Sequence, residues 1–294
     1  MERFPSELFT NWDIPAGITL VLGLIAIVYT IGWIRLRKTR PKQLSQWRLV
    51  SFLLGIIAIF VAVSSPLDTF SESLLFMHMA QHFVLMSIAP PLLVLGSPVV
   101  PLLRGLPKWL IRTVLRPFFR SRTLHSATAF LTRWPVAWIV MNVAYVGWHI
   151  PAAYEFALSS EGWHNMEHAC FLFTSILFWW ALILPWPARQ PGMQLLAVPY
   201  LAGADLVNTV LSAVLCFSGR LIYPSYATVD HPFPISALTD QVAAGAFMWV
   251  FGSLVFLIPV AGIIVRLLSA RPSAPLSPQP TAGAVSVEQQ PAFL

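Results

Sequence analysis

The run SLLFMHMAQHFVLMSIAPPLLVL, residues 73–95, is the clearest indication of how this chain folds. It contains no charged side chain, and its length matches the about 20 apolar residues that cross ~30 Å of hydrocarbon as a helix. The sequence therefore predicts an all-α integral membrane protein, a bundle of seven transmembrane helices. Their expected positions are residues 16–35, 48–65, 73–95, 135–151, 163–185, 196–217 and 241–265.

The composition supports the same fold class. Hydrophobic residues make up 57% of the 294 residues and charged residues only 10%, whereas a soluble domain carries about 25% charged residues. Because no polar stretch is long enough to fold alone, residues 1–270 are expected to form a single seven-helix membrane domain. Residues 271–294 are rich in Pro and Ser and are expected to be a disordered cytoplasmic tail.

The basic residues predict the orientation. All of the 18 Lys and Arg residues except Arg3 and Arg220 fall on one side of the expected bundle, mostly in the 35–48 and 96–134 connections. The basic side of a membrane protein faces the cytoplasm, so we expect the N-terminus outside and the C-terminus in the cytoplasm. This distribution explains the pI near 9.7 without a nucleic-acid partner.

Two histidine pairs are spaced as neighbours on a helix face. His78 and His82 are four residues apart in the 73–95 helix, and His164 and His168 repeat the spacing in the 163–185 helix. Residues at i and i+4 project from one face, and both helices start on the expected outer side. His149 ends the intervening antiparallel helix on that side. Because ionisable groups within membrane spans usually mark functional sites, we expect these five imidazoles to form one ligand cage.

Copper, as Cu(I), is the metal that this residue set favours. Imidazole suits several metals, but the thioether of Met86, placed one turn beyond His82, favours Cu(I). Metal-bound imidazoles usually donate their other N–H to a carboxylate or carbonyl. Glu167 and Asp240 are the candidates for that supporting role.

Two other functions fit parts of the pattern. A haem-binding or redox-active membrane protein would use two of the histidines as axial ligands of haem b. A zinc-dependent intramembrane hydrolase would use His164–His168, which matches H-x-x-E-H with Glu167 as the general base. The sequence shows no other nucleophile, phosphate loop or dinucleotide motif, so it does not require that the protein be an enzyme.

Three stretches together resemble the CtaG family, the assembly factor of caa-type cytochrome c oxidase. They are HMAQHFVLMSIAPPLLVLGSPVVPLLR, WHIPAAYEFALSSEGWHNMEHACFLFTSILFWW and DQVAAGAFMWV, and the resemblance covers about residues 15–270 with all seven expected spans. The resemblance implies a multi-pass protein of the bacterial inner membrane that serves oxidase assembly and is linked to copper supply. Its implied partners are oxidase subunits or copper chaperones on the periplasmic side. The family's histidines would fall on His78, His82, His149, His164 and His168, and its acidic and amide positions on Glu167, Asp240 and Gln241.

Overall fold

The computed structural model describes residues 12–39, 45–183, 193–229 and 232–269, and all regular elements within them are helical. The expected tail, 271–294, lies outside the described residues. In chain order the elements are α2 (Ala16–Thr39), α3 (Gln46–Ser64), α4 (Pro66–Ser71), α5 (Leu75–Phe83), η1 (Val84–Ile88), α6 (Ala89–Leu95), α7 (Val99–Gly105), α8 (Lys108–Leu110), η2 (Ile111–Leu115), α9 (Arg116–Arg120), α10 (Arg122–Leu131), α11 (Trp134–Trp148), α12 (Pro151–Leu158), α13 (Glu161–Ile183), α14 (Met193–Phe217), η3 (Pro224–Ala227) and α15 (Ala237–Ser269).

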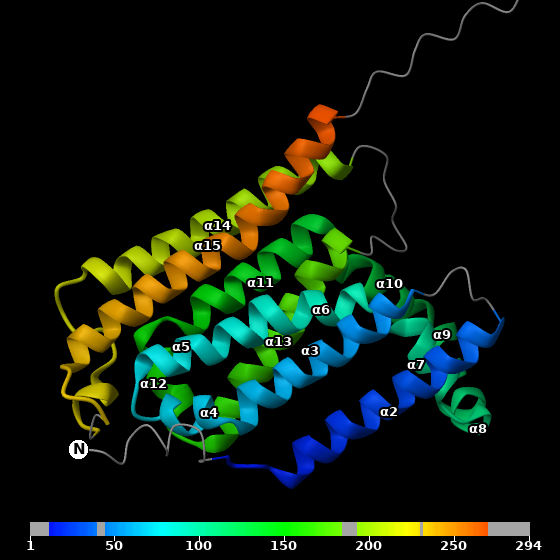
Figure 1. Cartoon of the computed structure of the whole chain (residues 1–294), viewed down its shortest axis with the longest axis horizontal. Helices are drawn as coiled ribbons and strands as arrows, with labels where there is room; N and C mark the ends of the chain where they lie inside the picture. The colour runs from blue at the N-terminus through cyan, green and yellow to red at the C-terminus, as the bar shows by residue number, and fades with distance from the viewer. Residues whose placement is uncertain (1–11, 40–44, 184–192, 230–231, 270–294) are drawn as a thin grey trace, which may run out of the picture.

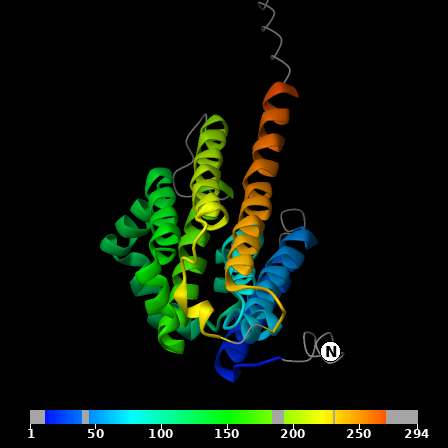
Figure 2. The same ribbon diagram turned by 90° about the vertical axis from the view of Figure 1, so that its left-hand side faces the viewer.

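The long helices run roughly alongside one another. The pair α14 and α15 lies along one side of the bundle and α2 along the opposite side, with α5, α6, α11 and α13 between them (Figure 1). The short helices α4 and α12 lie together at one end. The segment between α14 and α15, which contains η3, lies at the same end as the start of α2 (Figure 2). The basic elements α8, α9 and α10 lie toward the other end.

Six helices in the described ranges are long and apolar enough to cross a membrane, and a seventh crossing exists only if α10 and α11 count as one bent span. The expected span 135–151 is where the structure differs. Its helix, α11, has only 15 residues, about 22 Å of length at 1.5 Å per residue, and meets α10 at a bend of 72°. The helix ends at Trp148 because Pro151 opens α12, and a proline restricts the residue before it to extended backbone.

The 73–95 run forms one span in three pieces, α5, η1 and α6. Its middle piece is a π-helical turn that precedes Pro90 and Pro91. A proline has no N–H to donate to the carbonyl four residues earlier, so Pro90 leaves the Met86 carbonyl without its helical donor. The indole N–H of Trp179 supplies the missing hydrogen bond at 3.2 Å. This side-chain donor lets the span continue past the kink without an unpaired buried carbonyl.

Helices α2 and α7 approach each other through two glycines. A Cβ at Gly32 would lie 1.8 Å from the Pro101 carbonyl oxygen, and a Cβ at Gly105 would lie 1.8 Å from the Val28 carbonyl oxygen. Small residues allow such backbone contact between membrane helices. The alternating apolar and basic residues of 98–120 suggest a helix that lies on the lipid surface. The segment forms the short helices α7, α8, η2 and α9, of which α7 packs against α2.

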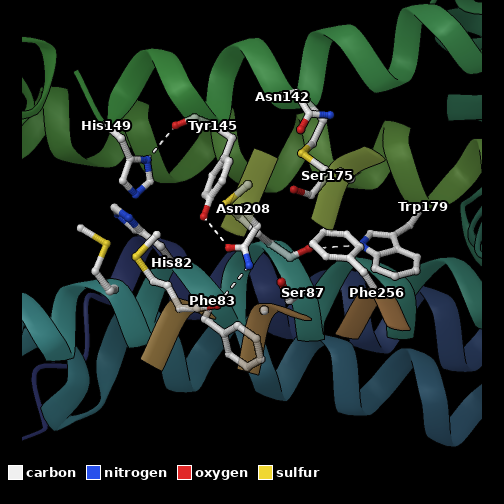
Figure 3. A pocket seen from close by; sticks show the side chains of 16 residues that line it. His82, Phe83, Ser87, Asn142, Tyr145, His149, Ser175, Trp179, Asn208 and Phe256 are labelled. Atoms are coloured by element: carbon white, nitrogen blue, oxygen red, sulfur yellow. Dashed lines mark hydrogen bonds between the residues drawn. The ribbon is translucent and has the colours of Figure 1, made fainter. Parts of the chain in front are cut away.

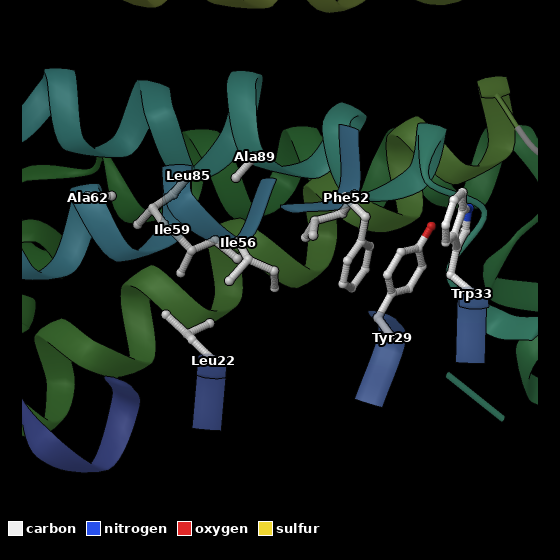
Figure 4. Packing of buried hydrophobic residues seen from close by; sticks show 10 residues of the cluster. Leu22, Tyr29, Trp33, Phe52, Ile56, Ile59, Ala62, Leu85 and Ala89 are labelled. Carbon is white, nitrogen blue, oxygen red and sulfur yellow. The ribbon is translucent and has the colours of Figure 1, made fainter. Parts of the chain in front are cut away.

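Beside this contact, α2 packs on α3 through stacked rings. The Tyr29 and Phe52 ring centroids are 3.8 Å apart, and the Tyr29 hydroxyl donates to the Gly96 carbonyl at 2.7 Å (Figure 4). The hydrogen bond joins Gly96, where the basic 96–134 connection begins, to α2, which in turn packs on α3.

Replacing Gly32 by alanine is expected to destabilise the protein by at least about 2 kcal/mol, because the added methyl group meets rigid backbone that cannot repack. The thermal midpoint of the detergent-purified protein measures the effect. Gly23→Ala is the matched control, because Gly23 lies on the same helix with nothing within 4 Å of its Cβ position. Equal midpoints for the two variants would contradict the close approach of α2 and α7.

Candidate metal centre

Four of the expected ligands come together at the end of the bundle that carries α4 and α12. His78 and His82 project from α5, and His164 and His168 project from α13. One nitrogen from each of the four rings lies within 4.8 Å of the other three. His78 is fully buried, His82 and His168 are nearly so, and His164 is partly exposed. The i, i+4 spacing thus places each pair on the face that turns toward the other helix.

Glu167 lies against this cluster. Its two carboxylate oxygens are 3.9 Å from His78 Nε2 and 3.8 Å from His82 Nε2. The side chain has 0% exposure, and neither oxygen has a hydrogen-bond partner among the described residues. A buried carboxylate without donors is costly unless a proton or a cation neutralises it. A proton or a bound cation would therefore stabilise Glu167 beside the imidazoles.

A tyrosine hydroxyl fixes which nitrogen of His78 faces the cluster. Tyr226, in η3, donates its hydroxyl proton to the Ser71 carbonyl at 2.9 Å, so its oxygen is left to accept. It accepts from the Tyr154 hydroxyl at 2.9 Å and from His78 Nδ1–H at 3.1 Å. His78 Nε2 then carries the free lone pair, and it points to His82 Nε2, 2.8 Å away. At this separation His82 Nε2–H donates a hydrogen bond to His78 Nε2.

Replacing Tyr226 by phenylalanine is expected to weaken metal binding by 10- to 100-fold, the usual effect of losing a partner that orients a ligand. The measurement is a competitive titration with a copper chelator of known affinity. Tyr200→Phe is the control, because the Tyr200 hydroxyl bonds the Phe178 carbonyl at 3.0 Å, outside the histidine cluster. Identical affinities for the two variants would show that Tyr226 does not orient the ligand.

His149 and Met86 lie next to the cluster, on the wall of a small cavity. The ring centroid of His149 is 6.2 Å from that of His82. His149 Nδ1–H donates to the Tyr145 carbonyl at 2.7 Å, which leaves Nε2 as a free lone pair without a partner (Figure 3). The structure therefore places both residues beside His82, and their roles as ligands stay predictions.

Asp240 contacts the backbone at the start of α5. Its carboxylate accepts from the backbone amides of Leu75 at 2.6 Å and Phe76 at 3.2 Å. The N-terminus of a helix has unpaired amides and a partial positive charge, and a carboxylate satisfies both. Asp240 thus caps α5, the helix that carries His78 and His82, from the first turn of α15. Through this contact Asp240 orients α5 and so influences the site. A direct bond from Asp240 to an imidazole stays a prediction.

Two further polar contacts hold the same end of the bundle. Gln81 donates from Nε2 to the Asp68 carboxylate at 2.5 Å and to the Ala62 carbonyl at 3.0 Å. Asp68 lies on α4, outside the spans, where burial raises the pKa of its carboxyl group above the ordinary value. Gln241 accepts from the Ile222 amide in the segment after α14 and donates to the Leu215 carbonyl near the end of α14. The residues that sequence reasoning missed are Tyr226 and Tyr154, which become neighbours of His78 only through long-range contacts.

The donor set fits a compact metal ion. Metal–nitrogen bonds of about 2.0 Å in a tetrahedral site place the ligand atoms about 3.3 Å apart, and the four ring nitrogens lie within 4.8 Å of one another. Small rotations of the side chains therefore suffice to bring the four ring nitrogens to bonding distance of one ion. The unpaired Glu167 carboxylate is available to balance its charge.

The chain is similar to three curated mycobacterial proteins, each named as uncharacterized. The chain is 28% identical over 312 residues to one from Mycobacterium leprae, covering 91% of this chain and 43% of that protein. Relatives from Mycobacterium bovis and Mycobacterium tuberculosis are each 27% identical over 309 residues, with the same coverage. The chain thus spans less than half the length of these curated relatives. No solved structure matches it.

The family comparison is more specific. Residues 27–270 match the model of the cytochrome c oxidase caa3 assembly factor, Caa3_CtaG. The match includes all five of the histidines discussed above, the 73–95 span and the whole of the last long helix, α15. This confirms the resemblance seen in the sequence: the chain belongs to the Caa3_CtaG family of cytochrome c oxidase assembly factors.

Proposed function

We propose that this chain binds copper as its cargo, in the form of Cu(I), and hands it on during the assembly of cytochrome c oxidase. The observation that carries the proposal is the cluster of His78, His82, His164 and His168 beside the unpaired Glu167 carboxylate. The family is one of oxidase assembly factors, and the oxidase is a copper-containing enzyme. A buried site that holds a metal without a substrate cleft suits a carrier.

The ligand chemistry favours Cu(I) over the alternatives. Neutral imidazoles with thioethers nearby select a soft monovalent ion. A haem b would need far more room, since the cavity next to His82 has about 40 Å³ and pockets for drug-sized ligands begin at about 300 Å³. A zinc hydrolase would need water and substrate at Glu167, whose side chain has 0% exposure. These points support a closed binding site rather than a catalytic one.

The charge distribution supports a periplasmic position for the site. With its basic end in the cytoplasm of the bacterial inner membrane, the bundle would have its N-terminus outside, and the histidine end would face the periplasm. His164 is the one partly exposed member of the four. It would accept the ion first, from a copper chaperone, and would release it last, to an oxidase subunit. His78 and Glu167 at 0% exposure would then hold the ion away from water.

Elemental analysis combined with a visible spectrum tests the proposal. The protein is purified in detergent under anaerobic conditions from cells supplied with copper, and we expect about one or two copper ions per chain and a spectrum without strong bands, since Cu(I) has no partly filled d shell. Zinc in place of copper would favour the hydrolase, and an intense Soret band would favour a haem protein. Metal content at background would count against all three.

A further inference from the structure

Four methionines line one small internal cavity. The cavity has about 40 Å³ and lies between α5, η1, α11, α13, α14 and α15. Its wall includes Met79, Met86, Met141 and Met248, which are half of the eight methionines in the chain. Each of the four is at least nine-tenths buried. The thioethers thus come from four separate elements, α5, η1, α11 and α15, and meet around one space.

The same wall carries polar atoms that lack partners. His149 Nε2, Asn142 Oδ1 and Ser175 Oγ are buried and have no hydrogen-bond partner in the described part of the chain. The side chains of all three line the cavity, as Figure 3 shows together with His82 and Tyr145. Buried polar groups are nearly always paired, so unpaired acceptors around an unfilled space indicate that something binds there.

Three other polar side chains on the wall are already paired with protein atoms. Tyr145 donates its hydroxyl to Asn208 Oδ1 at 2.8 Å, and Asn208 Nδ2 donates to the Met248 carbonyl at 3.2 Å. The Trp179 indole donates to the Met86 carbonyl. No carboxylate or basic side chain other than histidine lines the cavity. The unpaired groups that could donate electron pairs are therefore the His149 Nε2 and His82 Nδ1 nitrogens, the thioethers and two neutral oxygens.

Packing alone does not account for this arrangement. Methionine commonly fills irregular gaps in a core, and a core made that way is close-packed. Here the four side chains leave a space that is large enough for water or a bare ion. Thioether sulfur is a poor ligand for zinc, calcium and magnesium and a good one for Cu(I).

We propose that this cavity is a second Cu(I) site, in which His149 Nε2 and thioethers of the four methionines hold the ion. The inference rests on the proposed function, because it takes the chain to be a copper carrier. His82 lies on the shared wall, with Nε2 in the four-histidine cluster and Nδ1 unpaired. The ion moves from the cluster past His82 by exchange of one neutral ligand for another, without a change in its oxidation state. The chain thus holds a histidine site at its end and a sulfur-rich site deeper in the bundle.

The test compares two sets of variants of the full-length protein by anaerobic Cu(I) titration and by X-ray absorption at the copper edge. The wild type is expected to bind about two Cu(I) ions, with both nitrogen and sulfur scattering. Met141→Leu/Met248→Leu, which nearly conserves side-chain volume, is expected to lose one ion and most of the sulfur scattering. The control Met166→Leu changes a methionine that is 54% exposed outside the cavity, and it is expected to keep both ions.

The outcomes separate the two proposals. Copper bound by nitrogen alone, or an unchanged copper content in Met141→Leu/Met248→Leu, overturns the sulfur site and leaves the histidine site standing. Loss of sulfur scattering in Met141→Leu/Met248→Leu, with one nitrogen-bound ion remaining, supports the sulfur site. No copper in the wild type overturns both. If the double variant does not fold, judged by its thermal midpoint, the single variants Met141→Leu and Met248→Leu are each expected to weaken the sulfur-bound ion by about 10-fold.

Discussion

Alanine at both His78 and His168 is expected to reduce the copper of the four-histidine site from about one ion per chain to background. The double substitution removes one imidazole from α5 and one from α13, which leaves His82 and His164 on different helices. The ring centroids of the two removed residues are 6.3 Å apart across the cluster. Two nitrogens without a chelating pair cannot compete with cellular thiols for Cu(I). Elemental analysis of the purified variant measures the loss, and sulfur-bound copper is distinguished by X-ray absorption.

The physiological consequence is expected to follow the metal. Cells that carry only the His78→Ala/His168→Ala variant should assemble oxidase without its copper, which an oxygen electrode detects as lost cytochrome c oxidation. The control is His125→Ala, because His125 is an exposed histidine on α10, far along the chain from either pair. Normal oxidase activity in cells with the copper-free variant would instead make the chain a scaffold for oxidase subunits.

The fold could be predicted from the sequence where the signal is local. The apolar runs predict six of the spans, because a run of about 20 apolar residues can be recognised from the local sequence alone. The spacing of His78 and His82 likewise fixes a shared face as soon as a helix forms. The fourth span shows the limit of this reasoning. Apolar residues continue from 135 to 151, but Pro151 ends α11 early, and the bend of 72° to α10 depends on packing.

The surroundings of the site could not be predicted, because they depend on contacts between distant segments. The position of Asp240 in the sequence suggests that it caps its own helix, α15. Its carboxylate instead caps α5 by accepting from the Leu75 amide, and the two residues are 165 positions apart. Tyr226 gives no signal in the sequence, and only the fold brings its hydroxyl to His78. Met86 was expected to follow the face of His82 by helical spacing. Met86 lies in the π-helical turn Val84–Ile88, and it lines the same cavity as His82.

Glu167 offers the second large effect, because it is the acidic group whose oxygens lie closest to the clustered imidazoles among the described residues. Glutamine at this position keeps the size and shape of the side chain and removes its negative charge. A bound cation then loses the buried charge that balances it, and breaking a buried pair from one side costs about 3–5 kcal/mol. We expect Glu167→Gln to weaken Cu(I) binding by about 100-fold or more, measured by competition with a chelator. Zinc binding is expected to weaken as well, since the effect is electrostatic.

The control for this substitution lies on α12. Glu155→Gln changes a carboxylate that bonds Ser225, in the segment after α14, through both the backbone amide and the hydroxyl. It removes the same charge from the same end of the bundle without touching an imidazole, and it is expected to leave Cu(I) affinity within about 3-fold of wild type.

A hydrolase would behave differently from a carrier in this comparison. There, Glu167 would act as a base on water, so Glu167→Gln would abolish activity while the bound metal stayed in place. The Glu167 oxygens lie 3.8 and 3.9 Å from His82 and His78 and have no hydrogen-bond partner among the described residues. If Glu167→Gln kept the copper affinity of the wild type, the carboxylate would not balance the charge of the ion.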